Sequence, residues 1–323
     1  MIKKFFLLLI IISSLSTIVV IFQNTDKSNS INVKSSKLIF CLILTTPKSF
    51  KNGRVRTILN TWAYKCDGLK FITQHLTLNS TEKNSHFEYF TERDLLLYPP
   101  GLILDAYSKL TDKVYRTFLS VYSKYSNYSW YLKADDDTYI EMDNLNNFLM
   151  NKDPEMPVTF GHNFRIVVKD GYHSGGAGYV LSKKAFLSLG EKLNENFTFC
   201  PNSGVEDVDV AACLRKLNIS MGMSVDEQGK GRFLPTSINN MVEGDVSWLK
   251  HYRENIPKKD TECCSDSFIS FHNMSPEDMI FLDSVIKVLR KKSSRNNFKI
   301  KFKDIYANFR QYKNFEEEIL KKL

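Results

Sequence analysis

Several motifs that would assign a function at once are missing from this chain. No Cys-x-x-Cys pair occurs among its six cysteines, so a zinc site is not expected. Its glycines form neither a P-loop nor the Gly-x-Gly-x-x-Gly pattern of dinucleotide-binding folds. From residue 37 onward no Pro/Gly/Ser-rich break and no internal repeat divides the sequence, which favours one large domain.

Charge is missing from one long stretch near the amino end. Residues 5–22 are uncharged and mostly Phe, Leu, Ile and Val, and they follow Lys3 and Lys4. We therefore predict a cytoplasmic tail at 1–4 and a transmembrane signal-anchor at 5–22, with a cleaved signal peptide as the alternative. The short span favours a single-pass type II protein of the Golgi or endoplasmic reticulum membrane. Residues 23–36 are rich in Asn, Ser and Lys and are predicted to form a luminal stem.

The net charge of +8 comes in part from a basic stretch at 287–303. This stretch lies near the carboxyl end and belongs to no recognisable nucleic-acid module. It would also be luminal in the predicted topology, so nucleic acid is not an expected partner. We predict a catalytic domain at 37–290, followed by a basic, solvated C-terminal extension at 291–323.

The cysteines are even in number, as expected of a domain that folds in an oxidising compartment. Cys41 and Cys66 flank the first predicted strand and helix, Cys200 and Cys213 bracket an acidic segment, and Cys263 and Cys264 are adjacent. The adjacent pair can bond to each other in a small ring or to separate partners. Sequons for N-glycosylation, which agree with a luminal domain, begin at Asn79, Asn127, Asn196 and Asn218.

The order of the apolar segments predicts an α/β fold. Residues 38–44 form a continuous apolar run that is typical of a strand buried on both faces, and a helix is expected over 54–65. A short strand at 69–73, a helix over 112–125 and a strand that begins at Trp130 follow. This alternation is typical of a parallel sheet, in which ligands bind outside the carboxyl ends of the strands.

Three consecutive aspartates, Asp135, Asp136 and Asp137, directly follow the apolar run at 130–134. Adjacent like charges are unfavourable unless a positive group compensates them. An Asp-x-Asp at a strand end is suited to a hard divalent cation, such as Mg²⁺ or Mn²⁺, that bridges to substrate phosphates. The alternative is a solvated acidic turn, which is the commoner explanation for an isolated triplet.

Two further segments carry groups suited to binding or catalysis. Gly175 and Gly176 belong to a glycine-rich stretch before an apolar strand, where they allow either close approach of the backbone to a sugar or a β-bulge. Glu206, Asp207 and Asp209 open a predicted helix. A single carboxylate there is usually a cap, the role expected for Asp209, but three leave one free to act as a base.

Taken in order, these segments resemble one protein family. The core 1 β1,3-galactosyltransferases, and more distantly the fringe-type and other β1,3-glycosyltransferases, are similar to this chain at 130–139, 171–182, 206–208, 263–266 and 270–272. The similarity extends from about Ile39 to Asp283 and includes every cysteine.

The resemblance implies a GT-A fold, a Rossmann-like glycosyltransferase domain behind a transmembrane signal-anchor, in a type II Golgi membrane protein. It implies UDP-galactose as donor, Mn²⁺ as cofactor and GalNAc α-linked to Ser or Thr of glycoproteins as acceptor. The product is then the core 1 disaccharide of mucin-type O-glycans. It also implies a homodimer.

The resemblance further assigns roles to individual residues. The cation is implied to be held by Asp135, Asp137 and His272, with Asp137 in direct contact and Asp135 nearer the nucleotide. The donor is implied to lie against Thr45, Thr46, Pro47 and Asp135, and Gly175 and Gly176 are expected to line a sugar.

For the reaction itself, the family pattern places a catalytic base at Asp207, with Glu206 as the alternative. Inversion at the galactose anomeric carbon requires such a base to take the proton of the acceptor hydroxyl. Trp248 and Tyr252 match family positions near the acceptor, where aromatic rings stack on the apolar face of a sugar.

Three alternatives stay open from the sequence. A related β1,3-glycosyltransferase with a different donor or acceptor would share the cation ligands and the base. A non-catalytic chaperone of the same fold would lack the acidic motif, which this chain has. A membrane-tethered, lectin-like module would bind sugar without turnover.

Overall fold

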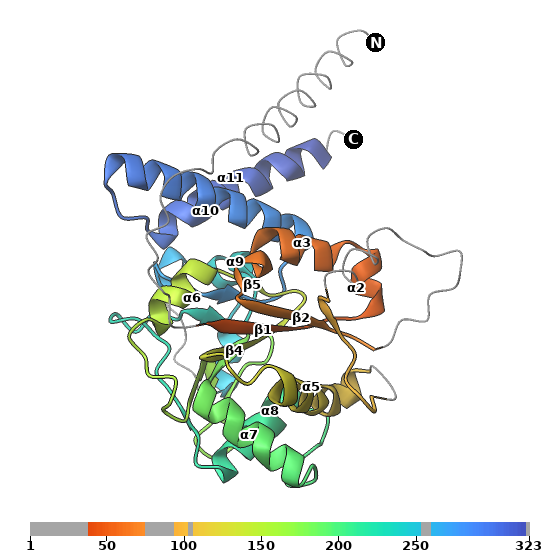
Figure 1. The fold of residues 1–323 in the computed structure, drawn as a ribbon. Coiled ribbons are helices and arrows are strands. Elements are labelled where there is room, and N and C mark those ends of the chain that lie inside the picture. The colour runs from red at the N-terminus through yellow and green to blue at the C-terminus, as the bar shows by residue number, and fades with distance from the viewer. Residues whose placement is uncertain (1–37, 75–93, 103–105, 253–259, 321–323) are drawn as a thin grey trace, which may run out of the picture. The chain divides into compact units, whose positions relative to one another are not determined.

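A seven-stranded sheet runs through the part of the chain that the computed structural model describes, which comprises residues 38–74, 94–102, 106–252 and 260–320 (Figure 1). The cytoplasmic tail, signal-anchor and stem expected at 1–36 lie outside these residues, as does the sequon at Asn79. Among the helices within these ranges, none has the length and apolar character needed to cross a membrane.

The strand order in this sheet is β10-β6-β9-β4-β1-β2-β3. The strands are β1 (Ile39–Leu44), β2 (Gly68–Ile72), β3 (Leu96–Leu97), β4 (Trp130–Asp135), β6 (Val158–Gly161), β9 (Tyr179–Ser182) and β10 (Ser220–Met221). The strands β1, β2, β3 and β4 are parallel, as the alternating pattern predicts. The strand β9 is antiparallel to both β4 and β6, so the sheet is mixed rather than parallel throughout. The expected α/β class is therefore confirmed.

Helices cover both faces of the sheet (Figure 1). All six residues of β1 are buried, and alternate side chains enter opposite layers of the core. One layer contains α3 (Arg54–Thr61), α6 (Met142–Leu149) and α9 (Ile238–Val242), with Trp62 buried at the end of α3. The other contains α5 (Leu110–Lys124), α7 (Lys183–Glu195) and α8 (Glu206–Lys216). This double cover explains the continuous apolar sequence of β1.

The carboxyl end of the chain differs from the expected solvated extension. Two long helices, α10 (Pro276–Asn296) and α11 (Phe302–Leu320), pack on the same layer as α3. Phe302 and Phe309 on α11 are fully buried. The core therefore continues beyond residue 290, because the apolar positions of α11 are spaced at helical intervals between basic residues.

Two small sheets complete the fold. One has the order β11 (Phe233–Leu234), β12 (Ser270–Phe271) and β5 (Tyr139–Ile140), and the other pairs β7 (Asn163–Phe164) with β8 (Tyr172–His173). The short helix α2 (Pro47–Lys51) follows β1, and the Thr46 side chain caps it by accepting the Ser49 N–H.

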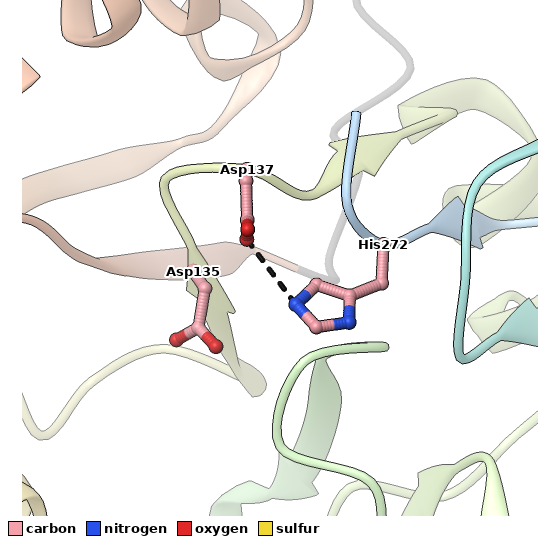
Figure 2. Close-up of side chains that lie close together, drawn as sticks. All are labelled: Asp135, Asp137 and His272. Carbon is pink, nitrogen blue, oxygen red and sulfur yellow. Dashed lines mark ion pairs between the residues drawn. The ribbon is translucent and has the colours of Figure 1, made fainter. Parts of the chain in front are cut away.

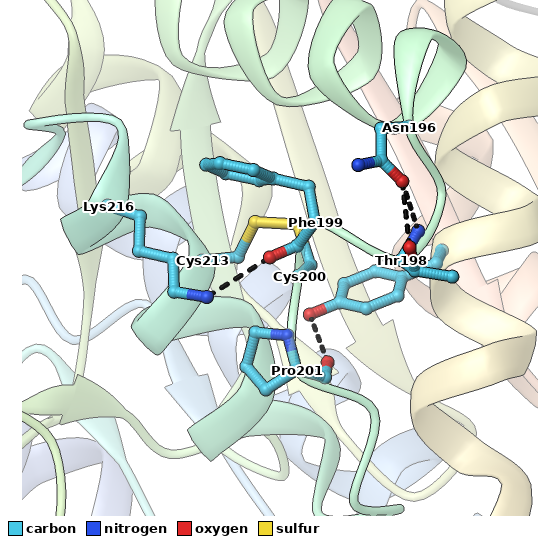
Figure 3. Close-up of a disulfide and its surroundings, with 8 residues drawn as sticks. Asn196, Thr198, Phe199, Cys200, Pro201, Cys213 and Lys216 are labelled. Atoms are coloured by element: carbon cyan, nitrogen blue, oxygen red, sulfur yellow. Dashed lines mark hydrogen bonds between the residues drawn. A yellow bond between two sulfur atoms is a disulfide. The ribbon is translucent and has the colours of Figure 1, made fainter.

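All six cysteines form disulfides, namely Cys41–Cys66, Cys200–Cys213 and Cys263–Cys264. The adjacent cysteines therefore bond to each other, which decides the question that spacing left open. Figure 3 shows how Cys200–Cys213 joins α8 to the loop before it, where the Lys216 ammonium group donates to the Phe199 carbonyl (3.1 Å). These contacts fasten the carboxyl-terminal half of α8 to that loop.

Candidate active site

The acidic triplet opens into a cleft of about 430 Å³ at the carboxyl end of the parallel strands. Leu44 at the end of β1 pairs with Asp135 at the end of β4, so the two strand ends meet. The cleft is lined by Leu44, Thr45, Thr46, Ala106, Tyr107, Leu110, Lys113, Lys133, Asp135, Asp136, Asp137, Gly175, Gly176, Gly204, Val205, Glu206, Asp207 and His272. This is the sheet edge at which the strand pattern predicts a ligand.

One wall of the cleft holds a group of possible cation ligands (Figure 2). Asp135, Asp137 and His272 each offer a ligand atom, and these atoms lie within 4.8 Å of one another. The antiparallel pairing of β12 with β5 brings His272 to the triplet across more than a hundred residues of sequence. The His272 Nε2 atom is 3.3 Å from Asp137 Oδ1, and its Nδ1 atom lies 3.3 Å from the Pro235 carbonyl oxygen.

The donor set fits Mn²⁺ or Mg²⁺, because two carboxylates and one imidazole suit Mn²⁺ and leave positions for substrate oxygens. The backbone also leaves room for this group. A Cβ atom at Gly176 would overlap the His272 ring, and one at Gly175 would lie 2.9 Å from Glu206 Oε2. The two glycines therefore clear space for side chains of the cleft, a simpler explanation than a β-bulge.

Asp136, to which the sequence assigned no role, contacts the segment that follows β1. Its Oδ2 atom accepts the Thr45 hydroxyl (2.7 Å), and Arg54 Nη1 lies 3.9 Å from its other oxygen. Burial raises the pKa of Asp136, while Ser49, Thr45 and Arg54 oppose that rise. Asp136 thus holds the loop after β1 in place against the triplet.

Arg54 also lies 3.8 Å from Asp137 Oδ2. Burial raises the pKa of Asp137, but the hydrogen bond and charge of His272, together with Arg54, lower it below its ordinary value. Burial lowers the pKa of His272, yet Asp137 and Asp135 raise it above the ordinary value. The two residues stabilise each other's charge, so Asp137 is held as a carboxylate, and a cation that binds here would replace the proton between them.

The opposite wall is the first turn of α8. Glu206 is 3% exposed; its Oε1 atom accepts the Tyr179 hydroxyl (2.5 Å), and its Oε2 atom is 3.2 Å from Lys133 Nζ. Burial raises the pKa of Glu206, and Lys133 opposes this. Both oxygens of Glu206 are therefore engaged by buried partners.

Asp207 is half-buried and faces the cleft. Its Oδ2 atom accepts the Gly175 N–H (3.0 Å), and its Oδ1 atom accepts the Val208 N–H (2.9 Å). Burial raises its pKa, while these hydrogen bonds and Lys133 oppose the rise. A carboxylate held in this way has a fixed orientation and remaining lone pairs for a substrate proton.

Asp209 does not cap α8 as expected. Its side chain accepts the N–H groups of Ser203 (2.7 Å) and Gly204 (3.2 Å) and the Thr111 hydroxyl (2.7 Å). Although Asp209 lies in the first turn of α8, its side chain fastens the preceding loop to α5 instead.

The remaining predicted residues divide between the cleft and its surroundings. Thr45 and Thr46 line the cleft, whereas Pro47 begins α2 and is not among the lining residues. Trp248 and Tyr252 lie outside the lining as well and form an aromatic cluster with Phe164, whose ring centroid is 4.3 Å from that of Tyr252. This cluster packs against Val208, the neighbour of Asp207.

Sequence reasoning missed two buried lysines that line the cleft. Lys133 lies in the middle of the β4 apolar run, and Lys113 Nζ donates to the Thr45 carbonyl from α5 (2.7 Å). For Lys133 the sequence did contain a signal, because the lysine lies within an apolar run that leads into three aspartates. A buried charge needs a partner, and these aspartates could supply one.

Comparisons with known proteins identify the family. A family model described as Fringe-like matches residues 34–226. The chain is 31% identical over 276 residues to glycoprotein-N-acetylgalactosamine 3-beta-galactosyltransferase 1 of Xenopus laevis, a match that covers 82% of this chain and 71% of the relative. Chondroitin sulfate synthase 3 of Homo sapiens is 31% identical over 103 residues, which is 28% of this chain and 11% of that protein.

Two solved structures are weakly similar. A galactosyltransferase in complex with donor and acceptor sugar analogues covers 73% of this chain and 87% of its own, with 12% identity and a TM-score of 0.38. A glycosyltransferase involved in glycosylation of the PBCV-1 major capsid covers 78% and 99%, with 11% identity and a TM-score of 0.35. The family assignment rests instead on the two matches in sequence that span most of the domain. By these, the chain belongs to the core 1 β1,3-galactosyltransferase family of fringe-related glycosyltransferases.

Proposed function

We propose that this chain is an inverting β1,3-galactosyltransferase that moves galactose from UDP-galactose to the 3-hydroxyl of GalNAc α-linked to Ser or Thr. The observation that carries this proposal is a single cleft with a cation-ligand group on one wall and an oriented carboxylate, Asp207, on the other. The similarity to the Xenopus galactosyltransferase supports the donor and acceptor, and a GT-A fold agrees with the mixed α/β sheet.

The donor would lie against the end of β1, where Thr45 and Thr46 line the cleft. Asp135, Asp137 and His272 would hold Mn²⁺, which when bound neutralises charge that develops on the leaving diphosphate. The Gly175 and Gly176 backbone would approach the sugar, since neither carries a side chain to exclude it.

Asp207 is proposed as the catalytic base. Two backbone N–H groups fix its orientation, and the attacking hydroxyl would transfer its proton to a carboxylate oxygen. Glu206 is the weaker candidate, because Tyr179 and Lys133 already occupy its oxygens and it is almost wholly buried.

The acceptor is proposed to approach past the aromatic cluster of Trp248, Tyr252 and Phe164. This cluster contacts α8 through Val208, one residue from the proposed base. Stacking of the GalNAc ring on an aromatic side chain there would present its hydroxyl to Asp207.

We further propose a type II Golgi or endoplasmic reticulum membrane protein with a luminal catalytic domain, which acts as a homodimer. Three disulfides agree with an oxidising compartment. The sequon asparagines Asn127, Asn196 and Asn218 are all exposed, which is compatible with luminal glycosylation.

The test is a donor and acceptor screen with the full-length chain, expressed in the secretory pathway and solubilised in detergent. UDP-galactose and rival UDP-sugars are each incubated with a GalNAc-peptide, and the product linkage is determined. We expect β1,3-linked galactose. Preference for another donor or acceptor would favour a related β1,3-glycosyltransferase, and sugar binding without UDP release would favour a lectin-like or chaperone role.

A further inference from the structure

One lysine lies between the two acidic walls of the cleft. Lys133, on β4, is 1% exposed. Among the described ion pairs, its ammonium group is the one that contacts a carboxylate on each wall. Its Nζ atom is 2.8 Å from Asp135 Oδ1 and 3.2 Å from Glu206 Oε2. A buried ammonium group is unfavourable without such partners.

The third contact of Lys133 reaches the proposed base through one residue. Lys133 Nζ donates to the Gly175 carbonyl (3.1 Å), and the Gly175 N–H donates to Asp207 Oδ2 (3.0 Å). The single residue Gly175 thus receives the lysine on one side and holds the carboxylate on the other. A shift of the ammonium group would move both.

The surroundings of Lys133 leave it little freedom. The Tyr179 ring lies below it, with its centroid 5.7 Å from Nζ, while the Tyr179 hydroxyl donates to Glu206. Burial lowers the pKa of Lys133, but Asp135 and Glu206 raise it above its ordinary value, so the group stays charged. Its charge and position are both fixed.

We propose that Lys133 is a positioning residue for the transfer reaction. Its ammonium group joins the cation ligand Asp135 to the unit of Gly175 and Asp207 and compensates the negative charge between the two walls. This proposal rests on the function proposed above in that Asp207 serves as the base.

The proposal predicts that loss of the ammonium group lowers the rate of catalysis without weakening cation binding. Without the ammonium group, Asp207 loses the contact that orients it through Gly175, and a small misplacement of a catalytic group lowers turnover by about 100-fold. The cleft also loses a positive charge beside Asp135, which favours a divalent cation. Damage to the fold alone would weaken both properties together.

The experiment uses the full-length chain with Lys133→Met, which keeps the length of the side chain, and Lys133→Arg, which keeps the charge. Mn²⁺ binding is measured directly by the electron paramagnetic resonance signal of free Mn²⁺, without donor or acceptor. Galactose transfer to a GalNAc-peptide is measured in parallel. For K133M we expect kcat to fall about 100-fold with Mn²⁺ affinity unchanged or tighter, and for K133R we expect kcat within about tenfold of wild type.

The matched control is Lys70→Met. Lys70 is also a buried lysine of the central sheet, 5% exposed, and pairs with Asp94 (2.8 Å) away from the cleft. K70M is expected to lose thermal stability while keeping kcat and Mn²⁺ affinity. The proposal is overturned if K133M keeps kcat within about threefold of wild type, or if it loses Mn²⁺ affinity together with kcat.

If K133M does not fold, Glu206→Gln provides a second test of the role proposed for Lys133. This isosteric change removes one of the two carboxylate charges beside Lys133, so its ammonium group is held less firmly and kcat should fall about three- to tenfold. An unchanged kcat, or a loss of about 1,000-fold as expected of a missing base, would overturn the proposal. If wild type transfers no galactose, the proposed function fails, whereas the Mn²⁺ isotherms still test the cation half of the Lys133 proposal.

Discussion

Two clusters contain several acidic side chains, one at the end of β4 and one after β5, and their surroundings differ. The first is the cleft, where Asp135, Asp137 and Asp207 face open space. The second, which we call the helix anchor, joins α10 to the segment after β5. Its members are Lys65, Glu141, Asp143, Asp283, Lys287 and Arg290.

In the helix anchor each carboxylate has a basic partner. Arg290 Nη2 is 3.0 Å from Glu141 Oε1, and Lys287 Nζ is 2.7 Å from Asp283 Oδ2. Asp143 pairs with Lys65 (3.0 Å) and also with Arg290. Its charges are balanced by the protein itself, so the anchor needs no ligand.

In the cleft the acids outnumber the basic groups that contact them. Lys133 serves both Asp135 and Glu206, and Arg54 stands nearly 4 Å from Asp136 and Asp137. Glycines leave space beside the cluster instead of side chains. Incomplete compensation of charge beside open space, rather than acidity alone, therefore marks a cation and substrate site.

Replacement of the proposed base is the largest expected effect. Asp207→Asn should lower kcat by about 1,000-fold, because the amide cannot accept the acceptor proton. Binding of UDP with Mn²⁺ should persist, since the cation ligands lie on the other wall. Steady-state transfer and calorimetric UDP binding measure the two. Near-normal turnover would assign the base elsewhere.

The second-largest effect is expected when a cation ligand is removed, and the same change in the helix anchor provides the comparison. Asp137→Ala should weaken Mn²⁺ binding at least about 100-fold, beyond the loss usual for an outer-shell partner. Asp283→Asn, in the helix anchor, should leave Mn²⁺ binding unchanged because Asp283 faces Lys287. Equal effects of the two changes on Mn²⁺ titrations would remove the distinction between the clusters.

A matched pair of glycines tests the space around the cation group. Gly176→Ala should displace His272 and lower Mn²⁺ affinity about tenfold, because the new Cβ overlaps the ring. At Gly231 an added Cβ has ordinary contact with Leu234 (3.4 Å), so Gly231→Ala should bind Mn²⁺ normally. Normal Mn²⁺ binding by G176A would show that His272 is not held as described.

Substitutions in the helix anchor should lower the stability of the fold rather than the rate of transfer. Arg290→Met removes the basic partner of the buried Glu141, while the Asp143 N–H and the Tyr139 hydroxyl still donate to it, and we expect a loss of about 2 kcal/mol in the free energy of unfolding. Chemical denaturation measures this, and Glu141→Gln added to R290M should recover part of it. Transfer at permissive temperature should stay within about twofold of wild type; a large loss would tie the anchor to the site.

The smallest effect is a displaced pH profile. The base must be ionised, and burial raises the pKa of Asp207, so transfer should fail on the acidic side at a higher pH than an ordinary aspartate would cause. The acid limb of kcat/KM against pH measures this. A limb at or below the ordinary aspartate range would contradict an Asp207 base.

The sequence predicts the parts of the site that are local. The triplet at a strand end, the glycines and the first turn of α8 each follow from short segments. His272 was accessible only through family resemblance, because its place depends on the pairing of β12 with β5. The role of Asp136 was not predicted by either route, because its partner Thr45 lies 91 residues away in the sequence.

In the fold, too, features that depend on local sequence were predictable and features that depend on distant contacts were not. The buried run of β1 and the order of the first parallel strands follow from apolar patterns. The antiparallel insertion of β9 and the packing of α11 do not, because tertiary contacts decide them. Lys133 is a charged residue in a buried strand, and its ion pairs with Asp135 and Glu206, rather than the apolar pattern of the strand, explain its position.

Galactose transfer from labelled UDP-galactose to a GalNAc-peptide, measured before and after chelation, tests the proposed cation-dependent reaction. We expect transfer by wild type with Mn²⁺, loss of transfer with excess chelator, and recovery when Mn²⁺ is restored. Transfer that is equally fast in the presence of chelator would contradict this proposal.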